Sequence, residues 1–440
     1  MIELASARKQ KINLADYNNE QDILNRILFS DFTPFDLMVV EEILFSPLKI
    51  SLKKIARSLQ TADETLLPIL TKLEKTGLLS REEDAIAVDK EMRKYFEFEM
   101  QRFDPRFTPD LDFFQGLLRK VPIHILPAWY SVPRSSNNIF ESIVEKHFLT
   151  PQIFHRYVME LKTGDPRVFA ILNDVINAPQ LRVSSSDLIA RYNLSRREFE
   201  EIMLRLEFHF ACCVSYSKED DHWDEIVTPF NEWKQYLVFL RETDAPPIAT
   251  PPQAAGDFAF IEELATLLQK LKKTPLPESE KNPLLEKLCL VRLADLKNGT
   301  FQAGVSADEW LDMTLENKSL YLYRHTYNRV LGYPHLNTLL EKHLREAEKS
   351  IKRVLRSGWV YFDDFIKGVY IPLSEHSVVM LRKTGKQWKY TLPQYTDEEK
   401  ELIKVTVFEW LRECGFVTTR KMNGKDSFCV TPFGRFFFDD

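Results

Sequence analysis

The chain has 440 residues, of which 44% are hydrophobic, 12% aromatic and 28% charged, the balance of a globular protein with room for about two to four domains. A formal net charge of −6 excludes nucleic-acid binding through the field of the whole molecule, so such binding must come from local basic patches. Only 13 glycines are present, which argues against glycine-lined phosphate loops.

Residues 1–31 form a predicted N-terminal extension without the apolar stretch of a secretory signal. No later run approaches the roughly 18–20 apolar residues of a membrane span. The five cysteines are an odd number without a disulfide spacing pattern, which suits a reducing compartment. We therefore expect a cytoplasmic protein with no membrane contact.

Residues 32–100 predict a first module of three helices followed by a β-hairpin. Gly77 stands where a glycine commonly ends a helix. The predicted elements are, in order, helices at 34–44, 52–59 and 62–76 and strands at 78–80 and 85–88. Residues 101–164 then form a helical and extended connector, in which 121–133 carries three prolines and is expected to be extended.

Residues 165–241 predict a second module of the same order. Ser195 and Glu198 have the spacing of a capping box, which starts the third helix of this module. A strand at 211–216, a polar turn and a strand at 225–228 predict its hairpin. A Pro/Ala-rich stretch at 242–256, without periodicity, is most simply a linker.

Residues 257–334 form a predicted helical region with two interpretations, a degraded further module or helices without one. Residues 335–440 predict a closing module. Its helices are expected at 340–355, 362–366 and 397–414, and Asn423-Gly424 is a strong hairpin signal between its last two strands.

Internal similarity links the modules. Ile55-Ala56-Arg57 matches Ile189-Ala190-Arg191, and the stretch from Leu73 to Leu79 resembles that from Leu411 to Val417. Three helices followed by a hairpin resemble the winged helix-turn-helix superfamily, and 415–438 is similar to winged-helix segments of some helicases and transcription factors. The resemblance implies a mainly α fold with small β-hairpin wings in tandem modules, DNA binding as the commonest function and protein assembly as the second.

In DNA-binding members of that superfamily the third helix enters the major groove and the wing contacts the backbone. The first module is poorly suited to this role, because its third helix begins with Asp63 and Glu64. Subtracting the number of Asp and Glu residues from that of Lys and Arg gives a formal net charge of 10 − 12 = −2 for residues 32–98 and 18 − 15 = +3 for residues 335–440. The candidate nucleic-acid-binding residues therefore come from the second and closing modules, and they are Arg196, Arg197, Arg205, Arg420, Lys421, Lys425 and Arg435.

Each of these cations also has an ordinary interpretation as a solvated surface charge that keeps the protein soluble. No P-loop, dinucleotide, zinc-protease or nucleophile-elbow motif occurs. Cys212-Cys213 indicates a packed pair in a strand, and its spacing from His209 and His222 fits no common zinc pattern. We expect no catalytic residue, cofactor, metal or small-molecule substrate.

Two functions remain open at this stage. The first is a DNA-associated regulator that contacts phosphates of double-stranded DNA through the second and closing modules. The second is an assembly or adaptor protein whose winged helices bind other proteins, which the acidic net charge and the acidic first module favour.

Overall fold

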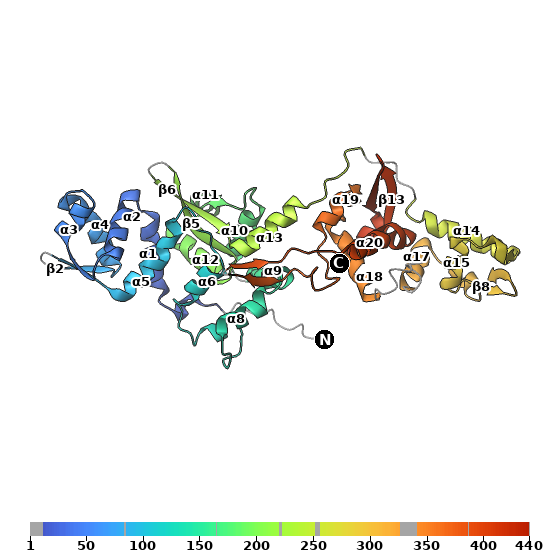
Figure 1. Cartoon of the computed structure of the whole chain (residues 1–440), viewed down its shortest axis with the longest axis horizontal. Coiled ribbons are helices and arrows are strands. Elements are labelled where there is room, and N and C mark those ends of the chain that lie inside the picture. The colour runs from blue at the N-terminus through green and yellow to red at the C-terminus, as the bar shows by residue number, and fades with distance from the viewer. Residues whose placement is uncertain are drawn as a thin grey trace. The chain divides into compact units, whose positions relative to one another are not determined.

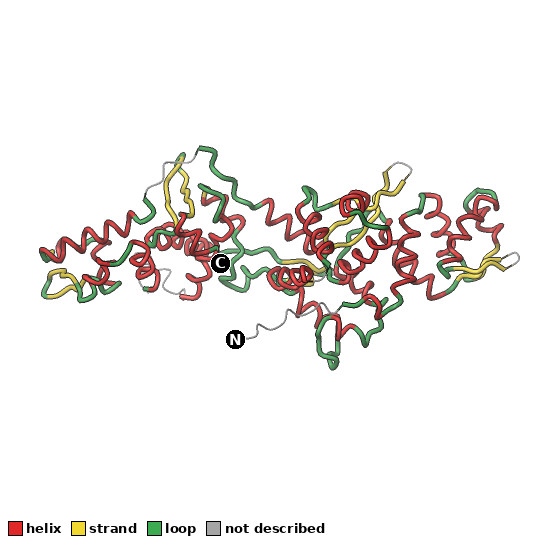
Figure 2. Tube along the Cα trace, turned by 180° about the vertical axis from the view of Figure 1, so that it is seen from behind, coloured by secondary structure: helices red, strands yellow, loops and turns green. Residues whose placement is uncertain are grey.

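The computed structural model of the chain describes residues 12–82, 85–163, 165–219, 222–250, 256–325, 341–385 and 387–439. Over these residues the fold is mainly helical with small antiparallel sheets of two or three strands, which confirms the predicted fold class at this level (Figures 1 and 2). Two compact units are present, Met1–Leu237 with Met380–Tyr390, and Val238–Val379 with Thr391–Asp440. The predicted boundary between 334 and 335 lies outside the described residues.

The first unit opens with η1 (Leu14–Asp16) and α1 (Asn19–Ser30), which lie in the predicted N-terminal extension, and the predicted first module follows them. A capping box between Thr33 and Asp36 starts its first long helix, and Gly77 ends its third with a φ of +79°, a left-handed conformation that glycine adopts readily. The sequence pattern does not predict the short strand after the first of these helices. The elements of this module are α2 (Pro34–Phe45), β1 (Lys49–Ser51), α3 (Leu52–Ser58), α4 (Asp63–Lys75), β2 (Leu79–Glu82), β3 (Ala85–Val88) and α5 (Lys90–Glu99).

The connector folds into short helices and turns. The extended conformation expected for 121–133 is wrong, because Pro127 lies in the first turn of a helix, where the missing N–H of proline costs nothing. The Phe114 ring packs against Phe148 and Phe210, with ring centroids 5.5 and 5.2 Å apart, so the connector shares a core with the second module. Its elements are η2 (Met100–Phe103), α6 (Leu111–Leu118), α7 (Leu126–Trp129), α8 (Ile139–Ile143), η3 (Val144–Phe148), α9 (Pro151–Met159) and η4 (Glu160–Thr163).

The second module follows with the predicted order. Ser195 and Glu198 form the predicted capping box, with both reciprocal hydrogen bonds present. The two hairpin strands are longer than the sequence pattern predicts. The elements are α10 (Pro166–Asn177), β4 (Val183–Ser184), α11 (Ser185–Tyr192), α12 (Arg196–Phe208), β5 (Cys212–Glu219), β6 (His222–Pro229) and α13 (Asn231–Glu242).

The second unit has a core of its own that includes the fully buried Trp310 and the almost fully buried Trp410. Its first half contains α14 (Ala259–Lys273), β7 (Leu276–Pro277), η5 (Glu278–Glu280), α15 (Pro283–Leu290), β8 (Ala294–Lys297), β9 (Thr300–Ala303), α16 (Ala307–Asp312) and α17 (Leu315–Arg324). Its second half contains α18 (Glu341–Glu348), η8 (Lys349–Val354), β10 (Val360–Tyr361), α19 (Phe362–Phe365), η9 (Ile366–Gly368), α20 (Asp397–Val405), η10 (Thr406–Leu411), β13 (Val417–Met422), β14 (Lys425–Val430) and α21 (Pro432–Phe438).

Among the described residues, four three-stranded sheets share one topology. In each, a short strand pairs antiparallel with the last strand of a following hairpin, which gives the orders β1-β3-β2, β4-β6-β5, β7-β9-β8 and β10-β14-β13. In each case a helix precedes the first strand, and helical elements lie between that strand and the hairpin. The same arrangement therefore recurs in the region 257–334, where the sequence leaves two interpretations open.

A fifth, two-stranded sheet interrupts the closing module. Its strands are β11 (Leu381–Thr384) and β12 (Gln387–Tyr390). The chain leaves the second unit after Val379 and returns to it at Thr391. This hairpin belongs to the first unit, where it lies beside α9 (Figure 1, orange-red). The sequence pattern places these residues in the closing module and does not indicate that they belong to the first unit.

Candidate nucleic-acid interface

The two arginines at the start of α12 already have carboxylate partners within the chain. Arg196 donates to both oxygens of Glu225 at 2.5 and 2.6 Å and also pairs with Glu200, and its side chain is 25% exposed. Arg197 is exposed and pairs with Glu20 of α1 at 2.5 Å and with Glu201 at 3.3 Å. A phosphate would have to replace these carboxylates.

The helix that carries them is covered on most sides. α12 packs against α1, α6, α10 and β5, and Glu200 and Glu207 are 1% and 0% exposed. Arg26 of α1 donates to Glu200 at 2.7 Å and to Glu207 at 2.9 Å. Arg205, further along the helix, is half-buried. This third helix is therefore packed within the unit, whereas a recognition helix exposes its outer face to the groove.

A second arginine completes this buried charge cluster. Arg102 donates to Glu207 and to Glu99, each at 2.8 Å. Burial alone would raise the pKa of the Glu207 carboxyl, but the Arg102 and Arg26 guanidinium groups outweigh it and hold this pKa well below its usual range. Both arginines and Glu207 thus stay charged and paired, as buried ions must be.

The closing hairpin presents its predicted cations to solvent. Asn423 and Gly424 form the predicted turn with φ values of +51° and +76°, and Arg420, Lys421 and Lys425 lie exposed on the two strands. The Lys425 ammonium lies 5.7 Å from the ring centroid of Tyr361. Lys421 lies opposite Asp426 in the two-stranded ladder, and the Asp426 carboxylate pairs with Lys404. Arg435 is exposed on α21.

The hairpin β11–β12 is a basic surface that the sequence analysis missed. Its base is fixed to the first unit, because Leu381 N–H donates to the carbonyl of Leu149 at 2.8 Å and the Tyr390 hydroxyl donates to the carbonyl of Phe148 at 2.7 Å. The Tyr390 ring also lies 5.9 Å from that of Tyr236. Leu381 and Tyr390 are both buried, so the strands project from an anchored base.

The two faces of this hairpin differ. Directly opposed residues of an antiparallel pair share a face. Arg382 opposes Lys389 and Thr384 opposes Gln387, so one face is entirely polar, and all four side chains are exposed. Within the described part of the chain neither Arg382 nor Lys389 forms an ion pair. Like charges directly opposite each other destabilise a sheet.

The opposite face carries Lys383 and Trp388, which oppose each other, with the ammonium 5.9 Å from the indole centroid. A signal for this hairpin does exist in the sequence. Residues 381–390 contain four cations and no acid, and without them 335–440 would count 14 − 15 = −1. The positive net charge of residues 335–440 therefore comes from this hairpin. A net charge summed over the whole module does not show where the cations lie.

No group of three or more His, Cys, Asp or Glu with the geometry of a metal site occurs among the described residues. Cys212 and Cys213 are fully buried, and burial raises the pKa of both thiols, as expected of a packed pair. Within the same described ranges no helix is long and apolar enough to cross a membrane.

Comparisons with known proteins return no match. No family model, curated protein or solved structure matches the chain.

Proposed function

We propose that the chain is a non-enzymatic DNA-associated protein built from tandem winged-helix modules, and that it contacts the phosphates of double-stranded DNA through basic hairpins. The modular part is supported by the strand order shared by four sheets, each preceded by a helix and closed by a hairpin. That order is the one expected of a winged helix, with a short 3-10 turn as the middle helical element of the third copy.

One observation carries the DNA-binding part of the proposal. Arg382 and Lys389 face solvent together on an anchored hairpin that contains no carboxylate. Phosphate contacts position a protein on a duplex without reading its sequence, and they need exposed cations in fixed places. The hairpin β13–β14 is a second, less basic candidate, because Arg420 and Lys425 are exposed on one face while Lys421 lies on the other, opposite Asp426. Arg196 and Arg197 are weaker candidates, because carboxylates of the chain already bind them.

A salt titration tests this function. The full chain should bind a labelled random duplex at low salt, and log K should fall linearly with log salt concentration. Replacing Arg382 and Lys389 by glutamine should lower the affinity and reduce the steepness of the line by roughly 2, since each phosphate contact contributes about 0.9. Arg106→Gln with Lys94→Gln is the matched control, because both cations are exposed in the same unit and pair with their own carboxylates. An absence of binding at low salt, or equal slopes for the two double variants, would overturn the proposal.

Protein assembly is the second candidate, and a different surface favours it. Met38 and Phe45 lie one heptad apart on α2, are 50% and 84% exposed, and share this outer side of the helix with the exposed Glu41. An apolar stripe with a carboxylate fits a partner helix with basic flanks. Met38→Ser with Phe45→Ser should abolish binding of such a partner without changing the affinity for duplex DNA. Equal capture of a basic amphipathic peptide by the variant and the original chain would exclude this candidate.

A further inference from the structure

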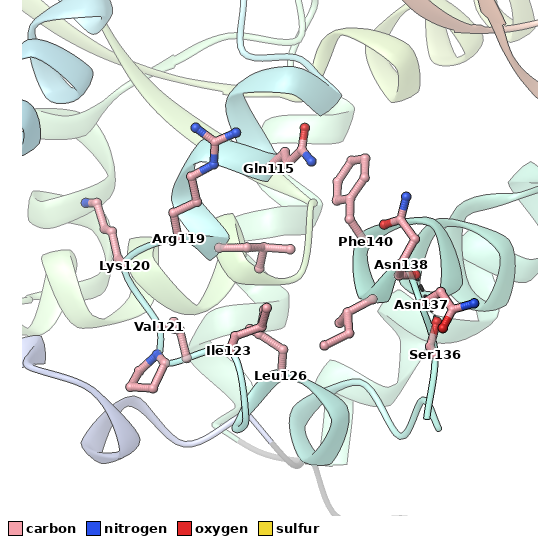
Figure 3. A pocket seen from close by; sticks show the side chains of 13 residues that line it. Gln115, Arg119, Lys120, Val121, Ile123, Leu126, Ser136, Asn137, Asn138 and Phe140 are labelled. Carbon is pink, nitrogen blue, oxygen red and sulfur yellow. Dashed lines mark hydrogen bonds between the residues drawn. The ribbon is translucent and has the colours of Figure 1, made fainter. Parts of the chain in front are cut away.

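A cleft of about 760 Å³ opens on the first unit at the end of α6. Residues 118–126 form one side, and residues 136–140, which lead into α8, form the other (Figure 3). None of the cations proposed to contact DNA lines it, so the cleft is a separate feature of the connector.

The inside of the cleft is apolar. Ile123 and Leu126 from one side and Phe140 from the other face the same space (Figure 3). Leu118 also lines it. Ile123 is 70% exposed, an unusual state for an isoleucine beside a concave apolar surface. A ligand that covered this side chain would remove apolar area from water, which favours binding.

The rim of the cleft is polar and lacks negative charge. No Asp or Glu lines it, and the exposed Arg119 has no ion pair among the described residues. The neighbouring Lys120 is already neutralised, because its ammonium pairs with Asp22 at 2.9 Å and with Glu99 at 2.6 Å. Arg119 is thus the one lining cation whose charge the described part of the chain leaves uncompensated.

Three amide side chains line the cleft, and two of them stand on opposite sides of its rim. Gln115 comes from α6, and Asn138 caps α8 through its side-chain oxygen, which leaves its NH₂ group available. Side-chain amides both donate and accept hydrogen bonds, so they match the alternating N–H and C=O groups of an extended peptide. A fatty acid would use the apolar walls and Arg119 but would leave these amides without partners.

We propose that this cleft binds a short extended peptide segment of a protein partner, with branched aliphatic side chains against Ile123 and Leu126 and an acidic side chain beside Arg119. The amides of Gln115 and Asn138 bond its backbone. This site is independent of the DNA contacts, so either property can fail without the other.

Fluorescence anisotropy of the full chain with labelled peptide pools tests the site. Peptides of about eight residues suffice to cross the cleft. One pool carries neighbouring Leu or Ile residues followed by Asp, and matched pools carry Asn or Lys in place of Asp. The Asp pool should bind saturably and more tightly than the Lys pool. Ile123→Asp should abolish binding, whereas Leu67→Asp, at an exposed apolar position on α4, should not.

The variant Arg119→Glu tests most directly whether Arg119 binds an acidic side chain of the peptide. Because rim ion pairs contribute about 1 kcal/mol, the variant should bind the Asp pool about fivefold more weakly and should now prefer the Lys pool. A merely structural role of Arg119 would weaken both pools alike and would contradict the proposal. The absence of any binding near about 1 mM peptide would also contradict the proposal. Displacement of the peptides by dodecanoate, with the same sensitivity to Ile123→Asp, would show that the cleft binds a fatty acid instead. Self-association of the chain in light scattering, if Ile123→Asp abolished it, would show that a second copy of the chain occupies the cleft.

Discussion

Arg382 and Lys389 lie directly opposite each other on the exposed face of the β11–β12 ladder. Their mutual repulsion should oppose the hairpin in the free protein, and an added anion should relieve it. Lys389→Glu replaces this repulsion by an opposite-charge pair. The variant should therefore be more stable by roughly 0.2–1 kcal/mol in chemical denaturation and should bind duplex DNA more weakly.

The charge-reversed pair is the control for this prediction. With Arg382→Glu added to Lys389→Glu, two carboxylates face each other, so the gain in stability should disappear while DNA binding stays weak. If Lys389→Glu left DNA affinity unchanged, the two cations would not be the phosphate contacts.

Local signals in the sequence predict local features of this fold. The capping box at Ser195, the glycine stop at Gly77 and the Asn423-Gly424 turn depend on hydrogen bonds and backbone conformations within a few residues, and all three are present. The order of helices and hairpins in the modules follows from the same kind of signal, since apolar periodicity reports which face of an element is covered.

Contacts between distant segments are what the sequence pattern misses. Glutamates usually face solvent, yet Glu200 and Glu207 of α12 are buried and both pair with Arg26, which lies 174 residues before Glu200. Likewise, nothing near residue 381 indicates that its strand is fixed to Leu149. Charge pairing and docking of this kind depend on three-dimensional placement, so the accessibility of candidate cations such as Arg196 could not be predicted.

Arg26 should be among the most sensitive positions of the first unit. Arg26→Met keeps much of the side-chain volume but leaves Glu200 and Glu207 buried with one fewer cation. Loss of one member of a buried ion cluster typically destabilises a protein by about 3–5 kcal/mol. Arg197→Met removes the exposed partner of Glu20 between the same two helices and should cost less than about 1 kcal/mol. Urea denaturation compares the two variants, and equal effects would mean that the buried cluster does not stabilise the unit.

Gly434 should resist a substitution that most helices favour. It lies in α21, where alanine would normally be better by about 1 kcal/mol, but an added Cβ would meet the Phe416 carbonyl oxygen at 2.1 Å. Gly434→Ala should instead destabilise the second unit by about 1–3 kcal/mol. Gly256→Ala is the control, because nothing lies within 4 Å of its added Cβ. A thermal midpoint of Gly434→Ala at or above that of the original chain would contradict the packing described here.

Glu232 should make the stability of the first unit depend on pH. Its Oε1 accepts a hydrogen bond from Leu111 N–H at 2.9 Å, whereas its buried Oε2 has no partner among the described residues. Burial raises the pKa of this carboxyl from 4.5 to about 8. Between these values the folded state holds a proton that the unfolded state has lost, so the contribution of Glu232 is greatest below pH 4.5 and falls as the pH rises to 8.

Glutamine at position 232 keeps the acceptor for Leu111 but cannot ionise. Glu232→Gln should therefore match the original chain near pH 5 and exceed it near pH 8, with the difference growing by at most roughly 1.4 kcal/mol per pH unit. Thermal unfolding at several pH values measures this, and Glu41→Gln, at an exposed position of α2, should show no such trend. A loss of stability in Glu232→Gln of the same size at both ends of the range would mean that the carboxyl contributes through its hydrogen bond and not through its proton.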